Sequence, residues 1–271
     1  MLEDTLRYCR KCGTQIEDQA LFCPKCGTPV NQQAPQSYRT RRNSSFPTAL
    51  IAIIAAVLIL ALILVPLFLS QWSPLGTIAG SGQVVTQNQQ FSDFTSVRVS
   101  NGFAFVITHS NSFSVKTITD DNLQNYIRVS KSGNTLSVGL KPGYSVTTSI
   151  LRVEISMPIL SRLELSGGTN GNATGFVSTN NFAIDASGGS VVQIQGQAND
   201  LTINASGGSQ LTLSDFAVKN ANVNLSGGTQ TEIKPTGRID ATLSGGSHLF
   251  YSGNPTLGNI NVSGGSTVEK R

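Results

Sequence analysis

Apolar and polar residues alternate along short segments of the chain, beginning near residue 91. Between residues 91 and 162 the alternation runs through SVRVSNGFAFVIT, NTLSVGL and ILRVEISMP. A period of two residues is typical of a β-strand with one buried face. This stretch therefore predicts several strands, which form either irregular first coils or a capping sheet for the repeat that follows.

A short phrase recurs six times from residue 163 onward, as LELSGGT, IDASGGS, INASGGS, VNLSGGT, ATLSGGS and INVSGGS. The serines that open SGG lie 18 to 21 residues apart, at Ser166, Ser187, Ser206, Ser226, Ser244 and Ser263. Such a period indicates a solenoid, in which each coil stacks on the one before it. The predicted fold class is all-β, a β-solenoid with coils of about 20 residues, and the Gly-Gly pair is expected to turn the backbone with positive φ.

Alignment on the SGG serine reveals two columns of equivalent residues. An apolar column stands three positions before the serine: Leu163, Ile184, Ile203, Val223, Ala241 and Ile260. A polar ladder stands two positions before it: Glu164, Asp185, Asn204, Asn224, Thr242 and Asn261. Since neighbouring coils lie about 4.8 Å apart, we expect the apolar column to stack inside the solenoid and the polar ladder to stack on its surface.

Residues 47–69 carry no charge. A helix of this length, at about 1.5 Å per residue, would cross a hydrocarbon core of roughly 30 Å, so we expect a single transmembrane helix at residues 46–70 rather than a buried core helix or a cleavable signal peptide. Arg39, Arg41 and Arg42 precede the segment, and the next basic residue is Arg98. The positive-inside rule then predicts a single-pass protein of the cell membrane, with a cytoplasmic N-terminus and an extracellular C-terminal domain.

All four cysteines lie near the N-terminus, as two C-x-x-C pairs: Cys9 and Cys12, then Cys23 and Cys26. This spacing supplies four thiolates for one tetrahedral Zn²⁺. A catalytic zinc keeps an open position, whereas four cysteines close the shell, so the expected cofactor is a structural zinc ion. A thioredoxin-like redox motif would need a βαβ context that about 25 residues cannot provide.

These features predict five segments of the chain. They are a zinc ribbon at 1–30, a linker at 31–45, a transmembrane helix at 46–70, a second linker at 71–82, and the β-solenoid domain at 83–271.

Charge limits the choice of partners. Charged residues make up 13% of the chain, and residues 73–271 contain 12 Lys and Arg against 11 Asp and Glu. A nucleic-acid-binding surface needs a basic patch to neutralise phosphates. A nearly neutral domain therefore argues against a nucleic acid partner.

The stretch from FTSVRVSNGFAFVITHS through LRVEISMPILSRLELSGG resembles the head GIN domain of the putative auto-transporter adhesin family, over about residues 82–268. This resemblance implies a β-solenoid at the cell envelope with a non-enzymatic role. The sequence YCRKCGTQIEDQALFCPKCGTPV, within residues 8–30, resembles short zinc-ribbon modules at the start of prokaryotic membrane proteins.

Three functions remain open at this point. The first is a membrane-anchored cell-surface protein that presents a non-enzymatic β-solenoid for binding, structural or adhesive roles, with the lipid bilayer as its anchor and an envelope glycan or protein as its ligand. The second is a transmembrane sensor that couples the external domain to the zinc ribbon and a cytoplasmic protein partner. The third is a polysaccharide-active β-helix enzyme, for which Glu164 and Asp185 are the neighbouring carboxylates.

Overall fold

The computed structural model of the chain describes residues 7–17, 20–30, 76–148, 150–178 and 180–271. The chain divides into two compact units, Met1–Leu64 and Val65–Arg271. The finer boundaries expected from the sequence stay a prediction.

Apart from the 3-10 helix η1, the regular secondary structure of the described residues is β-strand. The small unit contains β1 (Arg7–Tyr8) and β2 (Gln15–Ile16), which pair antiparallel. The first part of the large unit contains β3 (Thr77–Ala79), β4 (Val84–Gln89), β5 (Ser96–Val99), β6 (Ala104–His109), β7 (Ser114–Asp120), the 3-10 helix η1 (Asp121–Tyr126), β8 (Ile127–Ser132), β9 (Thr135–Leu140), β10 (Ser145–Thr147) and β11 (Leu151–Met157). The repeat region contains β12 (Arg162–Leu165), β13 (Asn170–Val177), β14 (Phe182–Ala186), β15 (Val191–Ala205), β16 (Gln210–Leu225), β17 (Gln230–Pro235), β18 (Arg238–Leu243), β19 (His248–Tyr251), β20 (Thr256–Val262) and β21 (Thr267–Lys270).

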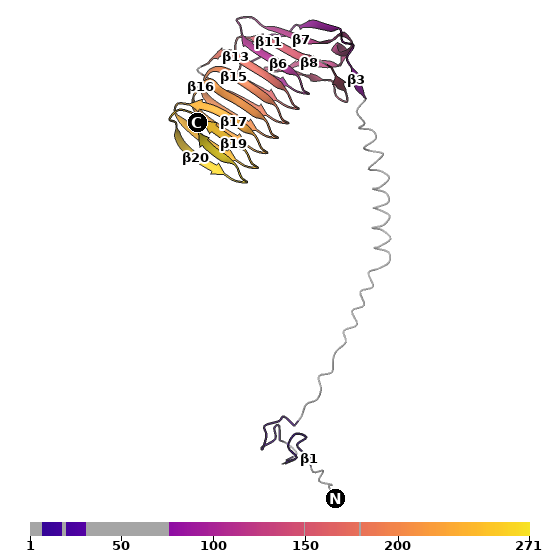
Figure 1. The fold of residues 1–271 in the computed structure, drawn as a ribbon, viewed down its shortest axis with the longest axis vertical. Helices are drawn as coiled ribbons and strands as arrows, with labels where there is room; N and C mark the ends of the chain where they lie inside the picture. The colour runs from indigo at the N-terminus through magenta and orange to yellow at the C-terminus, as the bar shows by residue number, and fades with distance from the viewer. Residues whose placement is uncertain (1–6, 18–19, 31–75, 149, 179) are drawn as a thin grey trace. The chain divides into compact units, whose positions relative to one another are not determined.

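The repeat region is a β-solenoid in which equivalent strands of successive coils pair in parallel (Figure 1). One stack runs from β5 through β12, β14, the second half of β15, the second half of β16, and β18 to β20. The other runs from β6 through β13, the first halves of β15 and β16, and β17 to β19 and β21. Each SGG phrase lies between a strand of the first stack and the following strand of the second.

The apolar column stacks inside the solenoid, as the sequence predicts. Ile184 pairs with Ile203, Ile203 with Val223, and Ala241 with both Val223 and Ile260. All members of the column are buried except Ile260, which is partly buried at the last coil. Burial of these side chains, at about 25 cal/mol per Å² of apolar surface, is the main force that holds one coil on the next.

The SGG phrase forms a tight turn that is closed by the residue after it. In the turn that begins at Ser187, Gly188 and Gly189 have φ of 65° and 75°, a left-handed conformation that glycine adopts without steric cost. The Ser190 hydroxyl is buried and donates a hydrogen bond to the carbonyl oxygen of Ser187 at 2.7 Å. The same bond closes three later turns, from Ser209, Thr229 and Ser247.

The stretch before the repeat is a first coil covered by a capping sheet, so it combines features of the two forms that the sequence left open. Strands β5 and β6 make the coil, since they pair in parallel with β12 and β13. On the other side of this coil, β9 pairs with β5 and β11 pairs with β6. Antiparallel partners extend this layer: β8 pairs with β9, β7 pairs with β11, and β4 pairs with β7. The hydrophobic end of the first coil is therefore covered.

The expected fold class included a single transmembrane helix, and the structure contradicts that part of the prediction. Within the described residues no helix is long and apolar enough to cross a membrane. A bilayer core of roughly 30 Å needs about 20 helical residues, and the helix of that part of the chain, η1, has 6. Residues 46–70, on which the prediction fell, lie outside the described residues.

Thr231 is a polar residue inside the second stack. It pairs with Leu211 on one side and with Leu249 on the other, and its buried Oγ1 has no hydrogen-bond partner. Thr231→Val replaces this hydroxyl with a methyl group of similar shape, so we expect it to raise the free energy of unfolding by about 1 kcal/mol. Chemical denaturation would measure the change. Thr212→Val, at an exposed position of the neighbouring coil, is the control and should change it by less than about 0.5 kcal/mol.

Candidate functional site

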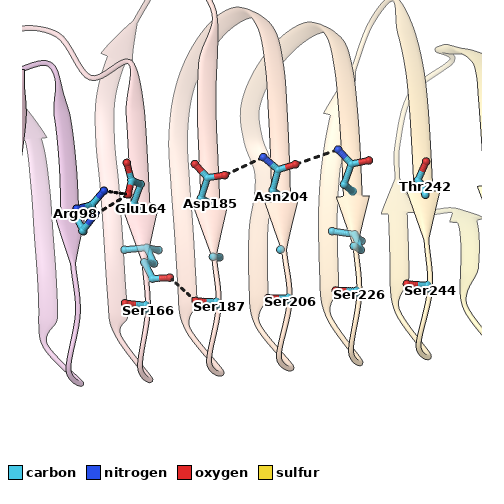
Figure 2. A pocket seen from close by; sticks show the side chains of 15 residues that line it. Arg98, Glu164, Ser166, Asp185, Ser187, Asn204, Ser206, Ser226, Thr242 and Ser244 are labelled. Carbon is cyan, nitrogen blue, oxygen red and sulfur yellow. Dashed lines mark hydrogen bonds and ion pairs between the residues drawn. The ribbon is translucent and has the colours of Figure 1, made fainter.

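The polar ladder crosses the first stack from coil to coil. Glu164 pairs in register with Asp185, and the same position continues through Asn204, Asn224 and Thr242 to Asn261. The ladder also extends into the coil before the repeat, where Arg98 pairs with Glu164. In Figure 2 the labelled side chains of Glu164, Asp185, Asn204 and Thr242 point in one direction from their strands. The sequence carries a signal for Arg98, since Val-Arg-Val-Ser has the same alternation as Leu-Glu-Leu-Ser.

Hydrogen bonds connect neighbouring side chains of the ladder. Asn204 Nδ2 donates to Asp185 Oδ1 at 2.9 Å, and Asn224 Nδ2 donates to Asn204 Oδ1 at 3.1 Å. The two amides therefore face the same way, each donating toward the earlier coil (Figure 2). Such a chain of bonds fixes the rotamers of exposed side chains and so keeps the polar surface ordered.

Arginine side chains balance the two carboxylates of the ladder. Arg98 Nε lies 2.7 Å from Glu164 Oε2, and Arg98 Nη2 lies 2.6 Å from the same oxygen. Arg162 Nη1 forms an ion pair with Asp185 Oδ2. Sequence reasoning did not find these pairs, because Arg162 stands outside the aligned columns and Arg98 stands before the repeat phrase begins.

A groove of about 520 Å³ lies along the ladder, within the size range of ligand sites. We call it the ladder groove. It is lined by the polar ladder from Arg98 to Thr242, by the serines that open SGG from Ser166 to Ser244, and by four apolar residues between them, Leu165, Ala186, Ala205 and Leu225. The groove therefore has two polar walls and an apolar strip, and it spans several coils.

Both carboxylates of the ladder groove are paired with arginines. Glu164 and Asp185 are adjacent rungs of one ladder and each is already bonded to an arginine. Asp240 lies outside the lining of the groove. Arg238 Nε and Nη2 each donate to its carboxylate at 2.7 Å, and these bonds lower the pKa of Asp240 to about 2. A general acid instead needs a raised pKa.

The four cysteines of the small unit come together. Their sulfur atoms all lie within 4.8 Å of one another. Cys9 Sγ is 3.6 Å from Cys26 Sγ, and Cys12 Sγ is 3.5 Å from Cys23 Sγ. Four sulfurs at about 2.3 Å from a tetrahedral zinc would be roughly 3.8 Å apart, so this donor set fits a Cys₄ metal centre.

The two halves of the cysteine cluster have the same construction. Each is closed by a backbone bond from the glycine after the second cysteine to the carbonyl of the first, at 2.8 Å for Gly13 and 2.9 Å for Gly27. A threonine follows each glycine. The Thr14 hydroxyl lies 3.3 Å from Cys12 Sγ, and the Thr28 hydroxyl lies 3.1 Å from Cys26 Sγ.

These hydroxyls favour the thiolate form of the two cysteines, because a hydrogen bond to the charged form stabilises it. The side-chain hydrogen bond between Cys12 and Thr14 lowers the pKa of Cys12 to about 6, and the one between Cys26 and Thr28 lowers the pKa of Cys26. A metal binds thiolates rather than thiols. Sequence reasoning missed both threonines, although the repeated Cys-Gly-Thr was a signal for them.

The fold and the two sites define a β-solenoid protein that carries an ordered polar face and a separate Cys₄ module. The chain belongs to the family "Putative auto-transporter adhesin, head GIN domain", whose model matches residues 93–255. A zinc-ribbon domain model matches residues 8–30. Both resemblances seen in the sequence are thereby confirmed, and membership of an adhesin family suggests a cell-surface protein.

A solved structure shares the fold of the large unit. A putative adhesin from Bacteroides fragilis matches with a TM-score of 0.59 and 16% identity, over 72% of this chain and 100% of that chain. A putative adhesin from Parabacteroides merdae matches with a TM-score of 0.48 and 20% identity, over 72% of this chain and 99% of that chain. No curated protein matches the chain.

Proposed function

We propose that this protein is a non-enzymatic adhesin-type protein of the cell surface, whose solenoid binds a component of the cell envelope in the ladder groove. The observation that carries the proposal is the groove itself, which follows an ordered row of polar side chains across successive coils. Polar groups that recur once per coil, with a serine of SGG on each coil of the groove from Ser166 to Ser244, suit a ligand that is itself repetitive, because each coil can make a similar contact. The adhesin names of the family and of the similar structures agree with binding rather than catalysis.

The small unit serves in this proposal as a structural zinc ribbon, with Cys9, Cys12, Cys23 and Cys26 as ligands. The close approach of the four thiols and the match to a zinc-ribbon domain support it. Four thiolates leave no open coordination position, so the ion would hold the fold and take no part in a reaction. The core of this unit is small, with Cys9, Ile16 and Cys23 as its buried apolar residues, and metal binding would supply the missing folding free energy.

A double substitution in the ladder tests the proposed binding site. Asn204→Leu with Asn224→Leu removes two adjacent amides that line the groove, and both positions are exposed, so the strands should still fold. We expect the full chain to bind isolated cell envelopes and the double variant to bind them roughly tenfold or more weakly, since each lost hydrogen bond contributes about 0.5–1.5 kcal/mol. Sedimentation of the labelled chain with the envelopes measures this.

The matched control removes two adjacent amides from another exposed ladder. Gln210 and Gln230 pair in register on the second stack and do not line the ladder groove. The double variant Gln210→Leu with Gln230→Leu should bind envelopes as the unchanged chain does. Equal binding by both double variants and the unchanged chain would refute the ladder groove as the binding site.

A further inference from the structure

We infer that the ligand of the ladder groove is an uncharged, hydroxyl-rich polysaccharide chain that lies along the solenoid axis. This inference rests on the proposed function and goes further, because it commits to one class of envelope component. It follows from three features of the groove: the hydrogen-bonding capacity of its walls, its charge, and its repeat.

The walls of the groove offer donors and acceptors together. A side-chain amide has two N–H donors and two acceptor lone pairs on its oxygen. The bonds within the ladder use one N–H each of Asn204 and Asn224, and one lone pair of Asn204. Every remaining position of these amides is available to a ligand, and Ser206 and Ser226 add hydroxyls on the opposite wall. The natural complement is a group that both donates and accepts, and a hydroxyl does both.

The charge of the groove disfavours ionic polymers. Of the residues that line it, Arg98 is the cation and Glu164 and Asp185 are the anions. Arg98 is paired with Glu164, and Asp185 is paired with Arg162. An anionic polymer would therefore meet two carboxylates and no unpaired cation, whereas the part of the groove from Asn204 to Thr242 carries no charge at all.

The repeat of the groove indicates how the chain lies. Equivalent groups recur once per coil, at a spacing of about 4.8 Å along the axis. The rungs from Glu164 to Thr242 occupy five successive coils, which is a length of roughly 20 Å. An extended β-linked glycan presents hydroxyls at a comparable repeat, so successive sugars meet successive coils. Residues of the groove include no aromatic side chain, so hydrogen bonds rather than ring stacking would give the affinity.

Affinity electrophoresis of the full chain through gels that contain dissolved polysaccharide tests this inference. Hydroxyethylcellulose and carboxymethylcellulose share one backbone and differ in charge, and glucomannan and arabinoxylan extend the neutral set. We expect at least one neutral polymer to retard the chain, and carboxymethylcellulose to retard it less than hydroxyethylcellulose. The Asn204→Leu, Asn224→Leu variant should lose roughly tenfold or more in affinity, and the Gln210→Leu, Gln230→Leu variant should lose none.

A second variant tests whether the first loses binding only because it misfolds. Ser206→Ala with Ser226→Ala removes the hydroxyls of the opposite wall without adding bulk, and it should also weaken retardation. Stronger retardation by carboxymethylcellulose, or no retardation by any neutral polymer, would overturn the inference. If the envelope binding described above still depends on Asn204 and Asn224 in that case, the proposed function stands and the ligand is of another class. If envelope binding does not depend on Asn204 and Asn224, the proposed function has failed as well.

Discussion

Replacement of Cys23 by serine is expected to abolish zinc binding by the small unit and to unfold it. Cys23 is buried, with 2% of its surface exposed, and its sulfur lies 3.5 Å from that of Cys12. In small zinc modules the free energy of metal binding, about 10–16 kcal/mol at neutral pH, is the free energy of folding. The buried apolar core of this unit is too small to replace it. We therefore expect one zinc ion per unchanged chain and a large loss in the variant.

Metal analysis of the purified full chain measures the zinc content, and titration of accessible thiols measures the folding of the small unit. Removal of zinc by a chelator should expose the thiols of the unchanged chain in the same way. Lys11→Ala is the matched control, because Lys11 is an exposed residue between two of the ligands and should leave one ion bound. A Cys23→Ser chain that keeps a full equivalent of zinc would contradict the Cys₄ site.

In the solenoid, the parts of the fold that carry the repeat could be predicted from the sequence, and the cap could be predicted only in part. The apolar column and the polar ladder could be read from the sequence, because six copies of one phrase align equivalent residues and stacking places them in register. The partners of β9 and β11 could not, since the strands of the cap carry no repeat phrase and pair with β5 and β6 across long separations in the chain.

The candidate site was predicted only in part, for a related reason. The four cysteines and the asparagines of the ladder follow from spacing alone. Arg162 and the hydroxyls that close the turns do not, because each acts through a partner in the folded chain. Ser190 is buried although it is polar, so a reading based on burial of apolar residues assigns it to the surface.

The turn and the ladder depend on each other. Each SGG turn begins two residues after a rung of the ladder, so the stacking of turns sets the register in which Asp185, Asn204 and Asn224 meet. Their hydrogen bonds at 2.9 and 3.1 Å require that register. A change that displaces one turn from the next should therefore weaken both the fold and the binding surface.

Gly207→Ala should accordingly be far more damaging than Gly208→Ala. Both glycines have positive φ, 68° and 77°, so an alanine at either position costs about 1–2 kcal/mol in backbone strain. A Cβ at Gly207 would lie 2.9 Å from the backbone nitrogen of Gly188 in the neighbouring coil, whereas a Cβ at Gly208 would have nothing within 4 Å. Relief of that clash requires the coils to separate, at a further cost of about 1–3 kcal/mol.

Denaturant unfolding of the two single variants measures this difference, and Gly208→Ala is its own matched control for backbone strain. We expect Gly207→Ala to lose about 2–5 kcal/mol in total. We also expect it to bind envelopes more weakly than Gly208→Ala, because the displaced turn begins two residues after Asn204. Equal losses of stability in the two variants would mean that close stacking of the turns contributes nothing beyond backbone conformation, and the dependence of the ladder on the turn would then be wrong.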